Sequence, residues 1–361
     1  MKLFLKVAVM LVIPVVLGVS NVASAQSTSN LPSKVEAWLA SPHADSSSEA
    51  FRHWDEDGEI PTACAACHSS TGFMDYIGAD GSAAGQVDMA AAPRTVVECA
   101  ACHSATASTM DSARFPSGMV IANLGSSATC STCHQGRASS NSVNAKTAGL
   151  EEDTPNTELG FINVHYRVAA ATLFGTEAKG GYEYAGNVYD GKFVHVPGLD
   201  SCTTCHNPHS LKVAPENCVS CHKVDILAAI RTSTIDFDGN GNTTEGVAAE
   251  INTLHAALEK AIQAYANEVV DKPIIYAPGV YPYFFNDDNA NGVGEPDETI
   301  YPNSYKSWTP RLLKAAYNYQ FVAGDPGAYA HNPRYTIQIL IDSIADLATK
   351  VALDMPQTVR P

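Results

Sequence analysis

Apolar residues recur every three or four positions along the last third of the chain, and this pattern predicts three helices. The first covers residues 246–270, with one face formed by Val247, Ile251, Leu254, Leu258, Ile262, Tyr265 and Val269. The second covers residues 310–323, between Thr309 and Gly324. The third covers residues 333–353, with a stripe formed by Ile337, Leu340, Ile341, Ile344, Leu347 and Val351. We expect these helices to pack on each other and on the preceding part of the chain.

The preceding part lacks such a pattern. Residues 69–160 are rich in Ala, Ser, Gly and Thr and show little aliphatic periodicity. Residues 179–193, KGGYEYAGNVYDGKF, are rich in glycine and tyrosine and predict turns or a short hairpin. Because these residues include few apolar side chains, they cannot form a core by themselves. Another apolar group must fill the interior there.

The first residues predict export. Lys2 and Lys6 flank a short basic start, an apolar run continues to about Val19, and Ala23-Ser24-Ala25 offers a cleavage site. A membrane anchor is the alternative, but a proline and a glycine interrupt the run. We predict a cleaved signal peptide over residues 1–25 and a periplasmic or extracellular protein. No later stretch reaches the roughly 20 apolar residues that a membrane span needs.

The net charge is −16, which argues against nucleic acid and anionic lipid as partners. Basic proteins, cations and other redox proteins remain compatible with such an acidic chain.

All ten cysteines belong to five C-x-x-C-H motifs. The motifs are Cys64, Cys67 and His68; Cys99, Cys102 and His103; Cys130, Cys133 and His134; Cys202, Cys205 and His206; and Cys218, Cys221 and His222. Disulfides are common in exported proteins, and paired C-x-x-C units often bind zinc. Neither chemistry requires a histidine after every pair, and five units do not divide into zinc sites of two.

Covalent haem attachment accounts for every residue of the motif. The two thiols bind the two vinyl groups of haem, and the histidine that follows binds the iron as proximal ligand. Five motifs therefore predict five haem c groups. They begin at residues 64, 99, 130, 202 and 218, without a regular repeat, and the short last interval should bring two haems into close contact. We predict a pentahaem-binding region over residues 26–223 and a helical C-terminal region over residues 224–361.

Three segments with the motifs resemble multihaem c-type cytochromes exported by metal- and sulfur-respiring bacteria. They are SPHADSSSEAFRHW before the first motif, NVHYRVAAATLFGTEAKGGYEYAGNVYDGKFVHVPGLDSCTTCHNPHS through the fourth, and WTPRLLKAAYNYQFV with AHNPRYTIQILIDSIADL near the end. The resemblance implies electron transfer along closely stacked haems. It also implies a mainly α fold with extensive loop, a haem core and a helical C-terminal region.

Each haem iron has a second axial position, and a closed position favours electron transfer over catalysis. Seven histidines lie outside the motifs, and His255 falls at the edge of its apolar stripe, which favours a partly exposed side chain. The six candidate distal ligands are His43, His53, His165, His195, His209 and His331. His209 is too close to His206 to serve that haem easily and should reach a neighbour. Six candidates for five sites leave one that is not a ligand or that serves another subunit.

One acidic loop matches the calcium-binding pattern D-x-N-x-N-G-x5-E. Its candidate calcium ligands are Asp287, Asn289, Asn291 and Glu298. Pro296 and non-helical flanks argue against a true EF-hand and leave an isolated calcium loop. The loop from Asp236 to Glu245 begins similarly but has Val247 where the closing acid belongs.

The sequence thus predicts a pentahaem electron carrier rather than an enzyme. Its expected partners are other redox proteins, and one specific form of the hypothesis is that copies of the protein assemble into a conductive filament. The alternative is a reductase of the pentahaem nitrite or hydroxylamine type with one open haem. The C-x-x-C-K site typical of nitrite reductases is absent, and the number of histidines leaves no haem obviously open.

Overall fold

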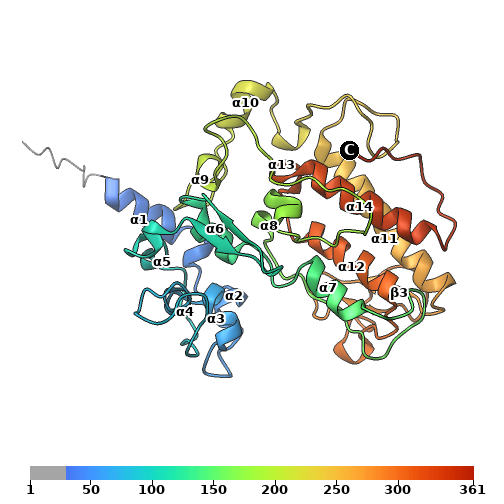
Figure 1. Ribbon diagram of the computed structural model, residues 1–361, viewed down its shortest axis with the longest axis horizontal. Helices are drawn as coiled ribbons and strands as arrows, with labels where there is room; N and C mark the ends of the chain where they lie inside the picture. The colour runs from blue at the N-terminus through green and yellow to red at the C-terminus, as the bar shows by residue number, and fades with distance from the viewer. Residues whose placement is uncertain (1–29) are drawn as a thin grey trace, which may run out of the picture.

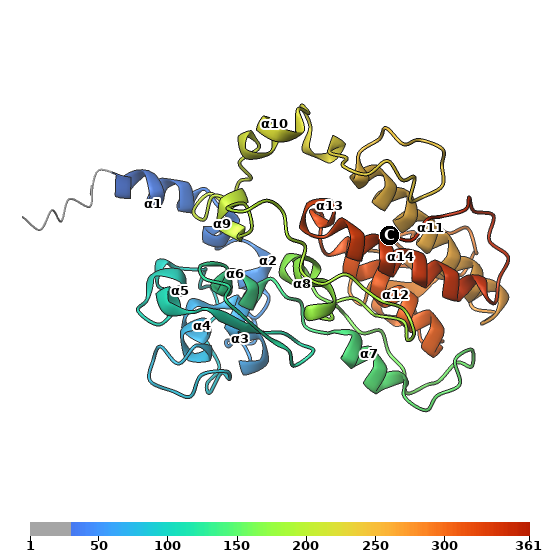
Figure 2. The same ribbon diagram turned by 45° about the horizontal axis from the view of Figure 1, so that its top comes forward.

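The computed structural model describes residues 30–361, so the predicted signal peptide lies outside the described residues. The segments before and after about residue 136 gather largely on opposite sides of the molecule, with α8 (Ala169–Phe174) between them (Figures 1 and 2). Helix α9 (Cys202–Cys205) belongs to the later segment but lies beside the earlier one. Within residues 30–361 no helix combines the length and the apolar character that crossing a bilayer requires.

The first part consists of short helices joined by loops. Its elements are α1 (Leu31–Leu39), η2 (Pro42–Ala44), α2 (Glu49–Arg52), α3 (Thr62–His68), α4 (Ser70–Tyr76), α5 (Cys99–His103), η3 (Ala107–Thr109), β1 (Ser112–Arg114), β2 (Val120–Ala122) and α6 (Ser127–Cys133). Strands β1 and β2 pair antiparallel, with Ala113 opposite Ile121. Polar caps define several of the helices; the hydroxyl of Ser69, for example, accepts the N–H of Gly72 at the start of α4.

The second part contains the long helices. Its elements are α7 (Ser140–Thr147), α8 (Ala169–Phe174), η4 (Gly175–Glu177), α9 (Cys202–Cys205), α10 (Glu216–His222), η5 (Leu227–Ala229), α11 (Val247–Glu268), β3 (Ile274–Tyr276), β4 (Phe284–Asn286), η6 (Tyr301–Asn303), α12 (Pro310–Ala323), α13 (Ala328–His331) and α14 (Pro333–Ala348). Strands β3 and β4 pair antiparallel, with Ile275 opposite Phe285.

The three predicted C-terminal helices are confirmed as α11, α12 and α14, and they pack against one another. Thr309 caps α12 by accepting the N–H of Leu312, and Asn332 caps α14 by accepting the N–H of Tyr335. Helix α14 ends at Ala348, a few residues before the predicted end. The mainly α character with much loop is likewise confirmed.

Residues 179–193 form turns rather than a hairpin, and they lie against α12 and α14. A side chain at Gly180 would come within 2.8 Å of the Phe321 ring, so only glycine fits that approach. The buried amide of Asn318 accepts the N–H of Tyr182 at 2.6 Å and donates to its carbonyl oxygen at 3.0 Å. The side chain of Asn318 therefore satisfies the backbone N–H and C=O groups of Tyr182, as a neighbouring β-strand would.

Apolar side chains are unevenly distributed. The main cluster extends from Ala113 to Val351 and crosses the boundary predicted after residue 223, whose position stays a prediction. Around α3 to α5 there are only two small clusters, one centred on Phe73 and Ile77 and one on Ile60. These few side chains cannot supply the hydrophobic stabilisation that a region of this size needs.

Replacing the amide of Asn318 tests its bridging role. We expect Asn318→Ala to lower the free energy of unfolding by at least about 2 kcal/mol, because two buried peptide groups lose their partner. Denaturant unfolding of the haem-loaded protein, followed by far-ultraviolet circular dichroism, measures the change. Asn252→Ala, on an exposed face of α11, is the matched control and should change stability little. Equal stabilities for the two variants would contradict the role assigned to Asn318.

Candidate haem-binding site

Each C-x-x-C-H motif lies on one turn of a short helix, α3, α5, α6, α9 or α10, and its histidine is the last helical residue or the one that follows. On a helix, positions i, i+3 and i+4 share one face. The spacing of the motif therefore aims both thiols and the imidazole at the same side. That is the arrangement needed to attach a porphyrin and bind its iron from below.

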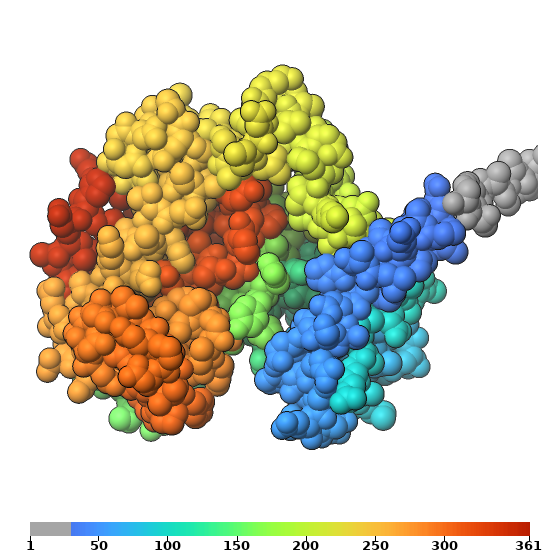
Figure 3. Space-filling model, turned by 180° about the vertical axis from the view of Figure 1, so that it is seen from behind, coloured from blue at the N-terminus to red at the C-terminus, as the bar shows by residue number. Residues whose placement is uncertain are grey.

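These faces line one large cavity, with a volume of about 2430 Å³. Nine of the ten cysteines, all five motif histidines and all six candidate distal histidines lie on its walls. Pockets for single small molecules measure about 300–1000 Å³, so this cavity has room for several large groups. Figure 3 shows the hollow between the N-terminal part and the C-terminal helices.

Each motif histidine faces one histidine from outside the motifs. The ring centroids are separated as follows: His43 and His134 by 6.3 Å, His68 and His165 by 5.7 Å, His103 and His209 by 6.1 Å, His195 and His222 by 5.9 Å, and His206 and His331 by 6.4 Å. Two imidazole nitrogens, each about 2 Å from one metal on opposite sides, lie about 4 Å apart, with ring centroids roughly 6 Å apart. The five pairs thus have the spacing of axial ligands to a single metal.

The pair of His68 and His165 is held from both parts of the molecule. Their Nε2 atoms lie 3.5 Å apart, and Nδ1 of His68 is 2.6 Å from the carbonyl oxygen of Ala50. His165 has a left-handed backbone conformation, and its N–H donates to the side chain of Asn163. Just beyond it, the N–H of Arg167 donates to the carbonyl of Gly324. These bonds from backbone N–H groups position His165 independently of its side chain.

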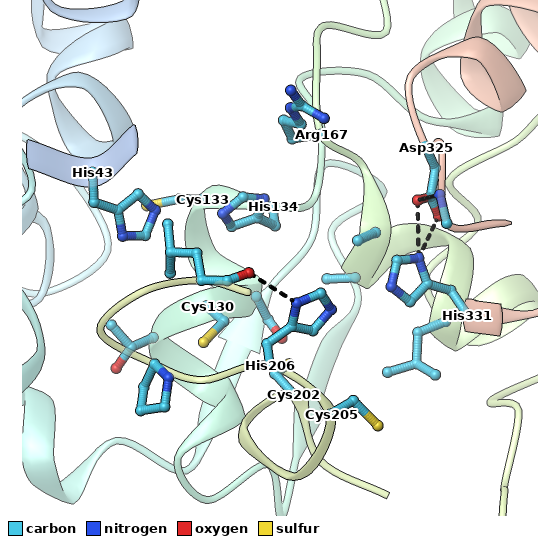
Figure 4. A pocket seen from close by; sticks show the side chains of 18 of the residues that line it. His43, Cys130, Cys133, His134, Arg167, Cys202, Cys205, His206, Asp325 and His331 are labelled. Atoms are coloured by element: carbon cyan, nitrogen blue, oxygen red, sulfur yellow. Dashed lines mark hydrogen bonds and ion pairs between the residues drawn. The ribbon is translucent and has the colours of Figure 1, made fainter. Parts of the chain in front are cut away.

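His331 has an acidic neighbour. Nδ1 of His331 lies 2.8 and 2.9 Å from the two carboxylate oxygens of Asp325, a residue that is buried (Figure 4). Burial lowers the pKa of His331, but the hydrogen bond and charge of Asp325 raise it by more, so the net shift is upward. The bond leaves Nε2 free and fixes the direction of the ring, as carboxylates do for metal-bound histidines. By contrast, Nδ1 of His206 faces the neutral carbonyl of Leu211 at 3.4 Å.

Four other paired histidines are half-buried. Burial lowers the pKa of His43 and of His68, and burial with the neighbouring His43 lowers the pKa of His134 to about 4. Burial and His68 together lower the pKa of His165 to about 4. At neutral pH these imidazoles are therefore uncharged, the form that binds metals.

Two histidines face no motif histidine. His53 is exposed, and its Nδ1 contacts the carboxylate of Glu49 at 2.8 Å. His255 is stacked on Tyr319, and its Nε2 lies 2.8 Å from the Tyr319 carbonyl oxygen. The structure therefore places five of the six candidate distal ligands opposite a motif histidine and leaves His53 apart. His209 faces the second motif rather than its own.

The motifs also contact one another. Cys67 Sγ lies 3.9 Å from the Thr132 carbonyl oxygen, which joins the first motif to the third. The helices of the third and fourth motifs meet where the N–H of Cys202 donates to the hydroxyl of Ser127 in α6 at 3.1 Å. Asn217, next to the fifth motif, donates to the carbonyl of Thr204 in the fourth at 2.9 Å. Ala101 of the second motif and Cys133 of the third belong to the same small apolar cluster.

The chain is similar to polyheme c-type cytochromes, and this similarity supports the interpretation that it is a multihaem cytochrome. It is 27% identical to the C-type polyheme cytochrome OmcB of Geobacter sulfurreducens over 354 residues, which cover 83% of this chain and 46% of OmcB. It is also 27% identical to the C-type polyheme cytochrome OmcC of the same organism over 383 residues, covering 90% of this chain and 48% of OmcC. The chain thus spans about half the length of these relatives. No protein-family model and no solved structure match it.

Sequence reasoning missed two residues that contact the paired histidines. Asp325 lies six positions before His331 and could have been noticed as the nearest upstream acid. Trp54 packs edge-on against His68, with ring centroids 5.1 Å apart, and it directly follows His53. In this segment the ring of Trp54, and not the predicted His53, contacts the motif histidine.

Proposed function

We propose that the protein is an electron carrier with five covalently attached haem c groups, each bound by two histidines. The observation that supports this most strongly is the one-to-one pairing of motif and non-motif histidines at ring separations of about 6 Å. Haem iron, when bound, accepts and releases one electron by changing between its ferric and ferrous states. The chain's own part is to hold, orient and enclose these groups.

The roles follow from the pairs. The ten motif cysteines would form the thioether bonds, and His68, His103, His134, His206 and His222 would be the proximal ligands. The facing distal ligands, in the same order, would be His165, His209, His43, His331 and His195. His53 has no such role in this proposal, because its imidazole is exposed and bonded to Glu49.

The contacts between motifs suggest the order in which the groups adjoin. The first motif contacts the third, the helix of the third motif contacts the fourth, and the fourth is hydrogen-bonded to the residue next to the fifth. The second motif lies beside the third through Ala101 and Cys133. This arrangement would give a continuous path from the first motif to the fifth, with the second as a branch. The 16-residue interval predicted to force close contact is the one bridged by Asn217.

A reductase with an open haem is less well supported. Such an enzyme needs one iron position left for substrate, whereas each motif histidine here has a facing imidazole. The partners of a carrier would be other redox proteins, and the acidic composition favours partners with basic surfaces. We place the protein in the periplasm or outside the cell, and a filament of its own copies is one form that the carrier could take.

Low-temperature EPR and visible spectra of the purified, oxidised protein test the proposal. We expect only low-spin signals and no change on adding nitrite or cyanide, because every axial position is filled. A high-spin component that shifts when nitrite is added would overturn the proposal and support the reductase.

The pairing itself predicts the effect of single histidine changes. His165→Ala should convert one haem of five to a high-spin form that binds cyanide, because the imidazole facing His68 is removed. His53→Ala is the matched control, since it removes a histidine from the same cavity wall without opening an axial position. EPR and cyanide titration measure both variants. A high-spin signal in His53→Ala and none in His165→Ala would reverse the assignment.

Asp325 should tune the haem held by the fourth motif. Its negative charge on Nδ1 of His331 favours the ferric state, so Asp325→Asn should raise the reduction potential of that haem by roughly tens of millivolts. Redox titration followed by EPR measures the change. Asp200→Asn is the control, because it removes the same charge from the cavity wall without contact to a histidine. Equal shifts in the two variants would show that the hydrogen bond has no special effect.

A further inference from the structure

The loop that follows β4, residues 287–298, wraps around two buried carboxylates. Asp287 and Glu298, its first and last residues, are only 5% and 6% exposed. Asp287 accepts the N–H groups of Asn291 at 3.2 Å and Gly292 at 2.7 Å. Glu298 accepts the N–H groups of Asp288 at 2.9 Å and Asn289 at 3.3 Å through its Oε1 atom. The two ends of the loop are thereby drawn around a common centre.

The other carboxylate oxygen of Glu298 has no partner. Its Oε2 atom is buried and makes no hydrogen bond to any described residue. Within residues 30–361, no lysine, arginine or histidine forms an ion pair with Asp287, Glu295 or Glu298. A buried, unneutralised carboxylate is costly, and the free energy is recovered when a cation binds to it.

A third carboxylate, which the sequence pattern did not single out, faces the same loop interior. The side-chain amide of Asn291 donates to Glu295 Oε1 at 2.6 Å, and that of Asn289 lies 3.5 Å from Glu295 Oε2. Glu295 is the ninth residue of the loop, a position that contributes a ligand, often through water, in twelve-residue calcium loops. Gly292, the sixth residue, has a φ of +76°, the sharp turn that such loops require.

We propose that residues 287–298 bind one calcium ion through Asp287, Asn289, Asn291 and Glu298, with Glu295 as a further ligand and the Val293 carbonyl oxygen as the ligand at the seventh position. All of these donors are oxygens, and they are numerous enough for the six to eight ligands that calcium takes. Magnesium prefers fewer protein ligands in strict octahedral geometry, so calcium is the better match.

The ion would stabilise the C-terminal helices rather than the haem path. The carbonyl of Gly292 accepts a hydrogen bond from Gln263 on α11, and the carbonyl of Glu298 accepts one from Asn303 in η6. None of the loop residues lines the haem cavity. Calcium binding should therefore raise thermal stability without changing the haem spectrum, and its failure would leave the electron-carrier proposal untouched.

The second acidic loop, from Asp236 to Glu245, differs in that Glu250, a buried acid beside it, already has a positively charged partner. Oxygen atoms of Asp236, Asp238 and Glu250 lie within 4.8 Å of one another, so a residue beyond the pattern supplies the third acid. Glu250 already pairs with Arg231 at 2.5 Å and accepts the N–H of Phe237. Its charge is therefore neutralised from within the protein, and the loop carries no calcium assignment here.

The test uses the full haem-loaded protein, treated with a chelator and then titrated with calcium chloride by isothermal calorimetry. We expect saturable binding of one calcium ion. The melting temperature, measured by circular dichroism, should rise on calcium binding, and the Soret band should not change. Glu298→Gln should weaken binding at least about 10-fold, because removing a direct ligand costs at least as much as removing a residue that supports one. Glu295→Gln should weaken it as well.

Asp297→Asn is the matched control, since it removes one charge from the loop at an exposed neighbour that the proposal does not use as a ligand. It should retain calcium binding. The absence of saturable calcium binding by the unmodified protein, or unchanged affinity in Glu298→Gln, would overturn the proposal. If Glu298→Gln does not fold, the unmodified protein still provides a test. Removing calcium from it with a chelator should lower its melting temperature, and adding calcium, but not magnesium, should restore that temperature.

Discussion

The pairing of imidazoles across the central cavity is the contact on which the rest of the arrangement depends. The part of the chain around α3 to α5 has only small apolar clusters, while α11, α12 and α14 share an extensive core. On the proposed ligation, the pair of His68 and His165 would connect these unequal parts through a metal. The haem groups would then do for the first part what buried leucines and phenylalanines do for the second.

Local patterns were sufficient for much of the fold. Helices α11, α12 and α14 were predictable because their apolar residues repeat with the helical period and because Thr309 and Asn332 cap two of them. Strands β1 to β4 were not, since three residues each are too few for an alternating pattern to be distinguished from loop. The C-x-x-C-H motifs placed their ligands on one helical face through spacing alone.

The choice of facing histidine could not be read from the sequence. His165 and His68 are 97 residues apart, and no local pattern encodes a contact at that distance. His53 and His43 occupy similar polar segments before the first motif, yet only His43 faces a motif histidine. The imidazole of His53 is exposed and contacts Glu49 within its own segment, and the sequence around the two residues does not reveal this difference. Asp325 and Glu295 were missed for the same reason, because their importance arises from folded geometry.

The position of His331 has a consequence for the order in which the protein matures. Its partner His206 belongs to the fourth motif, but α13 lies close to the C-terminal end of the chain. On the proposed ligation, a haem attached at Cys202 and Cys205 would have its proximal ligand from the motif itself, whereas His331 reaches its place only when α13 has packed. The fourth site would therefore stay open to an external ligand until that packing is complete. Closure of this single site would thus depend on the folding of the C-terminal helices.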